Sequence, residues 1–431
     1  MLDPPDPEAL AAANDVTAEE LPRFAPVSYE RDQPAVEDVP AATADAVRSL
    51  DGLASLDEGA RVAVTAGSRG IHDMPTVVRS IVGTLAAMGF EPFVVPAMGS
   101  HGGATAEGQR ETLASLGITK ESVGCEVVSS MAVERIATDS EGRPVYAAED
   151  AMAADAVVLT NRVKLHTDFS GPIESGLCKI AVVGLGKQRG AEAAHKAALA
   201  EGFADVLAER AALLFAETPI VGGVALVENA SERAAVIEGV DADDILDREP
   251  ELLERSEALL GTLPVEELDL LVVDEMGKDV SGTGMDTNVI GRLLMDGEPE
   301  PASPEYSRIY VRSLTDASHG NGIGIGLADY AHRDAVEALD LTDTYVNAIT
   351  SGEPVRSRIP LVMPSDRVAL TAAYSAVGVG DPAEMRIARV PNTLELDRFA
   401  VSEPVAEEIR DLPGVSVGEP EPLAFENGDL V

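Results

Sequence analysis

The stretch RVAVTAGSRGIHDMPTVVRSIVGTLAAMGFEPFVVPAMGSHGG (residues 61–103) decides the fold class of this chain. It contains the order strand, glycine-rich turn and helix twice, which indicates βα units on a mainly parallel sheet. The expected elements are a strand over 61–66, a turn over 67–70, a helix from Asp73 to Met88, a strand over 92–98, a turn over 99–103 and a helix over 105–116.

The same alternation continues along the chain. The segment 161–195 directly follows the apolar run AVVLT (156–160), so it leaves the carboxyl end of an expected strand. Ligands of open α/β sheets bind at that edge. Further expected elements are strands over 125–130, 156–160 and 219–229 and helices over 190–216 and 241–260.

A chain of 431 residues is too long for one ordinary core, so we expect two α/β domains with the active site in the crevice between them. The first is predicted over 1–262, with an acidic arm or edge element over 1–59. The second is predicted over 268–385, and the tail 386–431 is expected to return to the first domain. Within the second domain we expect strands over 269–277, 308–315, 322–330 and 359–364, a helix over 333–350 and a mobile loop over 275–305.

The charge balance is extreme, with 75 acidic residues against 32 basic ones and a net charge of −43. Such a field repels nucleic acid and anionic membranes. A folded, lysine-poor, acidic protein is typical of a salt-loving cytoplasm, where salt screens self-repulsion. Two cysteines, no apolar run of membrane-spanning length and no signal-peptide pattern at the start agree with a cytoplasmic protein.

Basic residues gather in the segment 161–195. The chain has six lysines, and four of them, together with two of its six histidines, lie in or directly after this segment. They are Lys164, His166, Lys179, Lys187, His195 and Lys196. A lysine-dense, glycine-punctuated loop in a chain that avoids lysine calls for a chemical reason.

Each candidate residue also has an interpretation without a function. His101, inside GSHGG, is placed for proton transfer, yet a loop histidine often caps a helix. Lys179 enters an apolar run, where it can be a desolvated amine suited to covalent attachment or can snorkel from the edge of a buried strand. Arg69 can clamp a carboxylate or pair with a surface acid. His195 can be an ordinary helix-surface residue.

Some reaction classes lack their motifs. The chain has no HExxH zinc motif, no G-x-S-x-G nucleophile elbow and no Walker A sequence.

Four segments of the sequence resemble a known protein family. GSRG (67–70), PAMGSHGG (96–103), the segment from His166 to Lys179 and KIAVVGLGKQRGAEAAH (179–195) resemble the nickel-pincer-nucleotide lactate racemases and related 2-hydroxyacid racemases and epimerases. The resemblance covers the first half of the chain well and the second half loosely.

The resemblance implies a role for each matched residue. Lys179 would carry the pincer nucleotide covalently, and His195 would ligate nickel through a neutral imidazole. His101 and His166 would form the acid/base pair, and Arg69 would bind the substrate carboxylate. Hydride would leave the 2-carbon, a planar 2-keto acid would form, and return to either face would invert the centre. Enzymes that make the cofactor are then expected partners.

The chain departs from the family pattern in three places. Ala66 stands where the family has an aspartate, and the spacer SGPIESGLCK is longer than the turn of the lactate enzymes. The substrate-contacting lysine of the second domain has only Arg292 and Lys278 as candidates. These departures predict a hydroxy acid other than lactate.

Two alternatives stay open at the level of sequence. One is a redox enzyme that acts on 2-hydroxy acids with this cofactor or a nicotinamide. The other is a non-catalytic protein that binds the pincer nucleotide. The presence of both candidate acid/base histidines favours the racemase, because a binding protein needs only Lys179 and His195.

Overall fold

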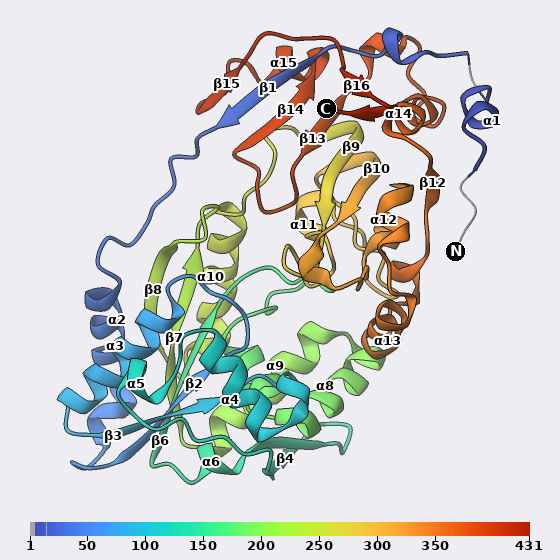
Figure 1. The fold of residues 1–431 in the computed structure, drawn as a ribbon. Coiled ribbons are helices and arrows are strands. Elements are labelled where there is room, and N and C mark those ends of the chain that lie inside the picture. The colour runs from blue at the N-terminus through green and yellow to red at the C-terminus, as the bar shows by residue number, and fades with distance from the viewer. Residues whose placement is uncertain (1–4, 14) are drawn as a thin grey trace. The chain divides into compact units, whose positions relative to one another are not determined.

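The computed structural model describes residues 5–13 and 15–431, and its contacts divide the chain into two compact units (Figure 1). Residues Gln33–Leu260 form one unit, and residues 1–32 with Gly261–Val431 form the other. We call them the central unit and the terminal unit, after their places in the sequence. Both are α/β units with mainly parallel sheets, which confirms the predicted fold class.

The central unit is built on a five-stranded sheet in the order β3-β2-β6-β7-β8. Its first four strands are parallel, and β8 runs antiparallel to β7. The strands of this unit, including the separate β4-β5 hairpin, are β2 (Arg61–Ala66), β3 (Glu91–Pro96), β4 (Val133–Thr138), β5 (Pro144–Ala148), β6 (Ala156–Arg162), β7 (Ile220–Glu228) and β8 (Ala234–Asp241). Its helical elements are α2 (Val39–Arg48), η2 (Asp51–Ser55), α3 (Met74–Ala87), η3 (Gly102–Ala104), α4 (Ala106–Ser115), α5 (Lys120–Val123), α6 (Glu149–Met152), α7 (Leu177–Lys179), η4 (Ile180–Gly184), α8 (Lys187–Glu201), α9 (Phe203–Glu217) and α10 (Ile245–Ala258).

Alternating side chains of the central sheet bury against two helical layers. Val62 and Val64 of β2 pack into the same cluster as α2 and α3, whereas Ala63, between them, packs into the cluster that contains α9 and α10. This alternation follows from the two-residue period of a strand. Because helices cover both faces, the strands are continuous apolar runs in the sequence. This is why they could be predicted from the sequence.

Several local expectations for the central unit are corrected. Residues 125–130 form no strand and share only a single bridge between Val94 and Val127. The expected helix 190–216 is two helices, α8 and α9, because Gly202 has a φ of 85° at their junction. The hairpin β4-β5 and the strand β8 were not expected from the sequence.

The terminal unit holds an eight-stranded sheet in the order β12-β11-β10-β9-β13-β14-β1-β15. Its strands are β1 (Phe24–Tyr29), β9 (Glu267–Met276), β10 (Glu305–Leu314), β11 (Tyr330–His332), β12 (Leu361–Met363), β13 (Ile387–Val390), β14 (Arg398–Ser402) and β15 (Val415–Val417), with a separate hairpin of β16 (Phe425–Glu426) and β17 (Asp429–Leu430). Its helical elements are α1 (Pro7–Ala11), η1 (Ala18–Glu20), α11 (Thr287–Ile290), η5 (Asp316–Ser318), η6 (Ile325–Leu327), α12 (Arg333–Glu337), α13 (Leu341–Ser351), η7 (Pro354–Ser357), α14 (Asp366–Tyr374), η8 (Pro382–Glu384) and α15 (Glu403–Ile409). The segment expected as a strand over 322–330 is mostly turn and η6, and the helix expected over 333–350 is divided into α12 and α13.

The division of the chain differs from the expected one at both ends. Strand β1 pairs antiparallel with β14 and β15, so the start of the chain joins the terminal unit. Strand β13 pairs parallel with β9, so the tail stays in that unit instead of returning to the first domain. Ala25 and Val27 of β1 are buried in the terminal core. The two ends of the chain thus complete one sheet between them, a long-range pairing that no local pattern signals.

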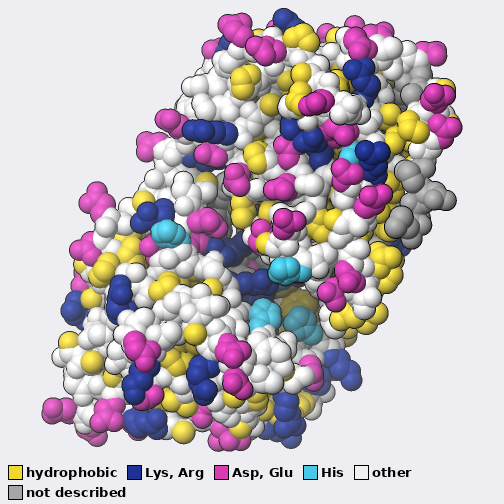
Figure 2. Space-filling model, viewed as in Figure 1, with side chains coloured by type: hydrophobic (Ala, Val, Ile, Leu, Met, Phe, Trp, Pro, Cys, Tyr) yellow, Lys and Arg dark blue, Asp and Glu magenta, His cyan; other side chains and the backbone are white. Residues whose placement is uncertain are grey.

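Acidic side chains are spread over the face of the molecule that Figure 2 shows, with Lys and Arg side chains among them. With 75 acidic and 32 basic residues, most carboxylates have no cationic partner available. Among the described helices, none is both long enough and apolar enough to cross a lipid bilayer.

We expect the melting temperature to rise steadily as KCl is raised from low concentration to about 1 M, where the Debye length falls to ~3 Å and like-charge repulsion is screened. Differential scanning calorimetry at fixed pH measures this. Sucrose of matched osmolality is the control, because it lacks ionic screening. A melting temperature that does not change with KCl would contradict the idea that unpaired acidic charge limits stability.

Candidate functional site

The candidate site lies where three neighbouring parallel strands of the central sheet end. In the order β3-β2-β6 the strands share one direction, so Pro96, Ala66 and Arg162 lie at the same edge. The loops that leave these strands carry His101, Arg69 and His166 respectively. Strand polarity alone therefore collects the three candidate loops on one side of the unit.

His101 lies in a turn that requires glycine. Gly99 and Gly102 have φ values of 60° and 69°, and a Cβ atom on Gly102 would lie 2.5 Å from the backbone carbon of Gly108. The His101 side chain is exposed, and its Nδ1 lies 2.5 Å from Oγ of Ser68 in the neighbouring GSRG turn. The first loop thus orients the imidazole of the second.

Residues 163–176, which we call the His166 loop, form a closed structure. At its base the Lys164 N–H donates to the Ser175 carbonyl at 2.9 Å. Inside the loop the carboxylate of Glu174, only 3% exposed, accepts the backbone N–H groups of His166 at 2.5 Å and of Gly171 at 3.0 Å. The long spacer between His166 and Lys179 is therefore held in shape by its own buried acid, whose pKa is raised to about 7 by burial.

The His166 ring is fixed from two sides. It stacks on Phe169 with ring centroids 4.4 Å apart, and the Asp168 N–H donates to its Nδ1 at 3.0 Å. Because Nδ1 accepts this hydrogen bond, the neutral imidazole carries its proton on Nε2. Burial, and then the nearby charge of Lys179, hold the pKa of His166 well below 6.5, so the ring is neutral at pH 7.

Lys179 lies on a helix and not at a strand edge. The short α7 continues into the π-helical η4, and the backbone N–H of Cys178 donates to Oε2 of Glu249 at 3.0 Å. A Cβ on Gly176, just before this helix, would lie 2.5 Å from the Glu249 carboxyl carbon, so a larger residue there would displace this carboxylate. Glu249, from α10, thereby fixes the start of the helix that presents Lys179.

Glu249 is an unusual capping residue because it is almost fully buried, with 2% of its surface exposed. Its Oε1 finds no hydrogen-bond partner among the described residues. Burial raises its pKa to about 7, against 4.5 for an ordinary glutamate. The helix of Lys179 is therefore tied to a carboxyl group that is poised to lose its proton near neutrality.

A run of rings joins the candidate acid/base residue to the candidate metal ligand. Phe169 stacks on His166 on one side and on Phe203, at 4.9 Å between centroids, on the other. His195 meets Phe203 edge-on, also at 4.9 Å. The Nζ atom of Lys179 lies 5.9 Å from the centre of the Phe169 ring. The structure thus brings His166, His195 and Lys179 together around two phenylalanines.

The electrostatics of this cluster favour neutral nitrogen bases. Burial and, to a smaller extent, the Arg69 guanidinium lower the pKa of Lys179 to about 8, whereas the Asp168 carboxylate opposes the shift. His195 is exposed overall, yet packing of its ring and the Lys179 charge lower its pKa below 6.5. A neutral amine is a nucleophile and a neutral imidazole is a metal ligand, so both groups are prepared for bond formation.

Arg292 and Lys278 were the candidates for a substrate contact from the second domain. Both belong to the terminal unit. The Arg292 guanidinium donates to Asp329 at 2.7 Å and to the carbonyl of Leu327 at 2.8 Å. The Lys278 ammonium donates to the Gly282 carbonyl at 2.6 Å and to the Asn347 amide oxygen at 3.0 Å. Each side chain therefore stabilises loops of its own unit.

Several residues of the site escaped the sequence analysis. They act as capping acids, stacked rings or hydrogen-bond partners of the predicted site residues. They are Asp168, Phe169, Glu174, Phe203 and Glu249. Three of the five, Asp168, Phe169 and Glu174, lie in the run HTDFSGPIESG (166–176). Its two acids could have drawn attention, since a carboxylate between a histidine and a lysine often shifts the pKa values of both.

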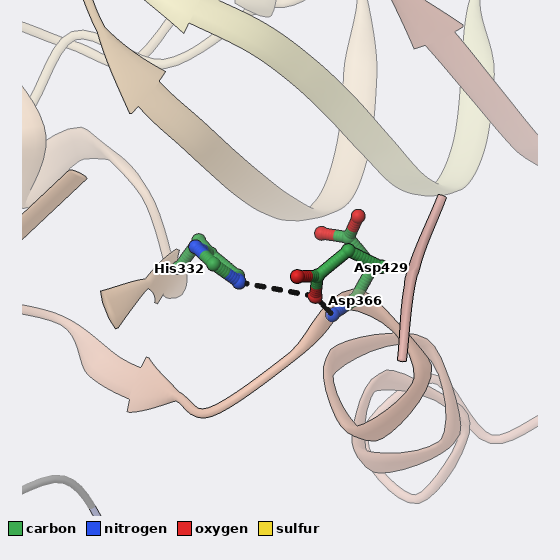
Figure 3. A group of neighbouring side chains, drawn as sticks. All are labelled: His332, Asp366 and Asp429. Atoms are coloured by element: carbon green, nitrogen blue, oxygen red, sulfur yellow. Dashed lines mark hydrogen bonds and ion pairs between the residues drawn. The ribbon is translucent and has the colours of Figure 1, made fainter. Parts of the chain in front are cut away.

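A second cluster lies in the terminal unit. Ligand atoms of His332, Asp366 and Asp429 lie within 4.8 Å of one another (Figure 3). The backbone N–H of Asp334 donates to Nδ1 of His332 at 3.2 Å, so the neutral ring has its proton on Nε2. That nitrogen lies 3.2 Å from Oδ1 of Asp429 and donates to it. The imidazole therefore turns a proton, and not a lone pair, toward the cluster.

The remaining acid of this cluster is already satisfied. Asp366 accepts hydrogen bonds from Arg312 Nε at 2.9 Å, from the Tyr310 hydroxyl at 2.6 Å and from the Leu430 N–H at 2.7 Å. A cation at this place would be repelled by the guanidinium. We interpret the cluster as an anchor for β17 at the end of the chain and not as a metal centre.

The comparisons agree with this fold. No family model matches the sequence, and no curated protein sequence matches it. The chain is similar in structure to the lactate racemase apoprotein from Thermoanaerobacterium thermosaccharolyticum, with a TM-score of 0.51 and 12% sequence identity over 89% of this chain and 96% of that one. At this identity the likeness shows a shared two-unit α/β fold.

We expect Lys179 to be the most reactive lysine of the protein at pH 7.5. With a pKa of about 8, roughly a quarter of its amine is neutral at that pH, against about one in a thousand for an ordinary lysine. Brief treatment with limiting acetic anhydride, followed by peptide mass spectrometry, measures this. Lys187 is the internal control, because its pKa is also about 8 but its surface is 0% exposed. Faster labelling of Lys196 would contradict the assignment.

The substitution Glu249→Gln should stabilise the protein by an amount that grows as the pH rises from about 4.5 to about 7. In the folded state the pKa is about 7 and in the unfolded state about 4.5. The wild type therefore loses stability as pH rises through this window, and the amide does not. We expect a gain on the order of 2 kcal/mol at pH 8 and none near pH 4.5, measured by urea unfolding. Glu254→Gln, at an exposed position of the same helix, is the control. A stability gain that does not depend on pH would show that the raised pKa of Glu249 is not its cause.

Proposed function

We propose that this chain racemises or epimerises a 2-hydroxy acid with a nickel-pincer nucleotide carried covalently by Lys179. The observation that carries the proposal is the setting of Lys179. Its pKa is lowered to about 8, and its charge acts on the rings of both His166 and His195. An amine prepared for covalent attachment thus lies beside a candidate base and a candidate metal ligand.

The residues present fit this group. Formation of a covalent bond at Lys179 needs its neutral amine, which the lowered pKa supplies near neutrality. Nickel accepts imidazole readily, and His195 has a lowered pKa that keeps its ring neutral at pH 7. When bound, the nucleotide supplies an acceptor for the hydrogen and electron pair that leave the 2-carbon of the substrate.

The chain itself handles the proton of the hydroxyl group. His166 presents an N–H at Nε2, because its Nδ1 accepts from the Asp168 amide. His101 can present a lone pair at Nε2 when its Nδ1 donates to Ser68, whose hydroxyl can turn to accept. One imidazole then takes the hydroxyl proton while the other polarises the oxygen of the planar 2-keto acid. When the alcohol forms again, the imidazole that took the proton returns it to the hydroxyl oxygen.

Arg69 is placed to hold the substrate carboxylate. Its exposed side chain follows β2 at the same sheet edge, and its charge acts on both Lys179 and His166. A guanidinium binds a carboxylate through two parallel hydrogen bonds. In a chain of net charge −43, this local group of cations gives an anionic substrate a favourable point of approach. A substrate contact from the second domain stays a prediction for Arg292, whose guanidinium donates to Asp329 within the terminal unit.

Loading of the cofactor tests the attachment. We expect protein produced together with the cofactor-synthesis enzymes to carry a nickel-containing adduct on Lys179, detected by intact mass and metal analysis. Lys179→Ala should abolish the adduct, and His195→Ala should keep the organic adduct but lose most of the nickel. Lys196→Ala, on the surface of α8, is the matched control. An unmodified Lys179 under these conditions would refute the proposal.

Chiral chromatography of a panel of 2-hydroxy acids then tests the reaction. We expect inversion without any added electron acceptor, whereas a redox enzyme requires one and a binding protein gives no turnover. His101→Gln and His166→Gln should each lower kcat by about 100-fold or more, as loss of a general acid or base does. His72→Gln, an exposed histidine of the same unit, should leave kcat unchanged. Full turnover in both site variants would show that the acid/base pair is misassigned.

A further inference from the structure

Lys187 is the one lysine of the basic segment that is wholly buried, with 0% of its surface exposed. It is the first residue of α8 and adopts a φ of 52°, which is uncommon for a residue with a side chain. Its ammonium donates to the Pro96 carbonyl at the end of β3, at 2.6 Å, and to Oε1 of Gln109 at 2.9 Å. The side chain therefore ties the start of α8 to the end of a neighbouring strand.

Gln109 passes this link on to the turn of His101. It is also 0% exposed, and its Nε2 donates to the carbonyl of Gly99 at 2.9 Å and to the carbonyl of His101 at 3.4 Å. The amide thus accepts from the lysine with one atom and holds the glycine-rich turn with the other. A continuous hydrogen-bonded path runs from the ammonium of Lys187 to the backbone of His101.

We propose that Lys187 is a positioning residue that holds the His101 turn in register with α8, the helix that carries His195. The proposal rests on the function proposed above, in which His101 transfers a proton. Lys187 itself touches neither substrate nor cofactor. It acts through Gln109, and its role is to fix where the His101 ring stands relative to the other loops at the sheet edge.

A purely apolar side chain would not serve this role. Burial of an ammonium is costly unless its protons are accepted, and here the pKa falls to about 8 although two oxygens accept from it. The hydrogen bonds offset this cost, because they satisfy the buried Pro96 carbonyl and Gln109 amide oxygen. A methionine in place of Lys187 would leave both oxygens without a donor. An amide without its partner is then able to rotate, and the turn that it holds loses its anchor.

The link has a direct consequence for the reaction. The turn of His101 is exposed and glycine-rich, with Gly99, Gly102 and Gly103 all at positive φ, so its backbone has little stiffness of its own. Displacement of a catalytic group by about 1 Å can lower a rate by about 100-fold. A buried anchor two hydrogen bonds away from the turn therefore affects kcat and not substrate affinity.

The test uses the full-length protein with ¹³C-labelled histidine, and the His101 signal is assigned with His101→Gln. We expect Lys187→Met to shift or broaden the His101 ring signal and to move its titration midpoint, while the signals of His319 and His332 in the terminal unit stay unchanged. Gln109→Met should have the same effect. The double variant should be no worse than either single one, because both remove the same path.

In the loaded enzyme we expect Lys187→Met to lower kcat by about 10- to 100-fold with KM changed by less than about threefold. Lys196→Met, an exposed position on the same helix, is the matched control for both measurements. Thermal unfolding of each variant shows how far stability changes as well. If Lys187→Met does not fold, the same measurements are made on Gln109→Met. This variant keeps the hydrogen bond from Lys187 to Pro96 and removes only the link to the His101 turn.

A His101 signal and titration that do not change in folded Lys187→Met or Gln109→Met would overturn the proposal, even where the melting temperature falls. A changed His101 signal in a protein that racemises no hydroxy acid would support the link and refute the proposed function. The two failures are therefore distinguishable, because the spectroscopic measurement needs neither cofactor nor substrate.

Discussion

The common direction of β3, β2 and β6 is the constraint on which the site depends. Parallel strands end at one edge, so the loops after Pro96, Ala66 and Arg162 must emerge together, whatever their sequences. Parallel pairing requires crossover connections, and the alternating burial of the β2 side chains shows that helices cover both faces of the sheet. The site is therefore a product of the core: a strand that reversed its direction would send its loop to the opposite edge.

Burial of charge without full compensation is the second principle of the site. Lys179, Glu174 and Glu249 all have pKa values shifted toward neutrality, chiefly because protein replaces water around them. Such shifts cost stability, and they are concentrated near the helix that presents Lys179. Buried titratable groups with shifted pKa values that gather around one helix are typical of functional sites. In the terminal unit, by contrast, the buried acid Asp366 is fully paired and its pKa is lowered, so that it serves only the fold.

Local patterns predicted the strands and turns of the central unit well. The strand expected over 61–66 is β2, residue for residue, and the helix expected from Asp73 starts at Met74. These elements are apolar runs bounded by glycine turns, so their signal is contained in neighbouring residues. The segment after Lys179 was ambiguous because an apolar run fits a strand or a buried helix equally well. The helix formed, and its start is held by Glu249, which lies on α10, far away in the sequence.

The sequence by itself determined the fold class, the strand-end turns and the residue types at the site, because each of these depends on patterns within about a dozen residues. Tertiary structure alone decided that β1 and the tail complete one sheet, and that Phe203 joins His195 to the ring stack of His166. It also decided the burial and the hydrogen-bond partners of Lys187. In the sequence this lysine lies in a basic loop. The hydrogen bonds that lead from its ammonium through Gln109 to the His101 turn form only when three separate segments pack together. Contacts between residues far apart in sequence are set by the whole core, and no local pattern records them.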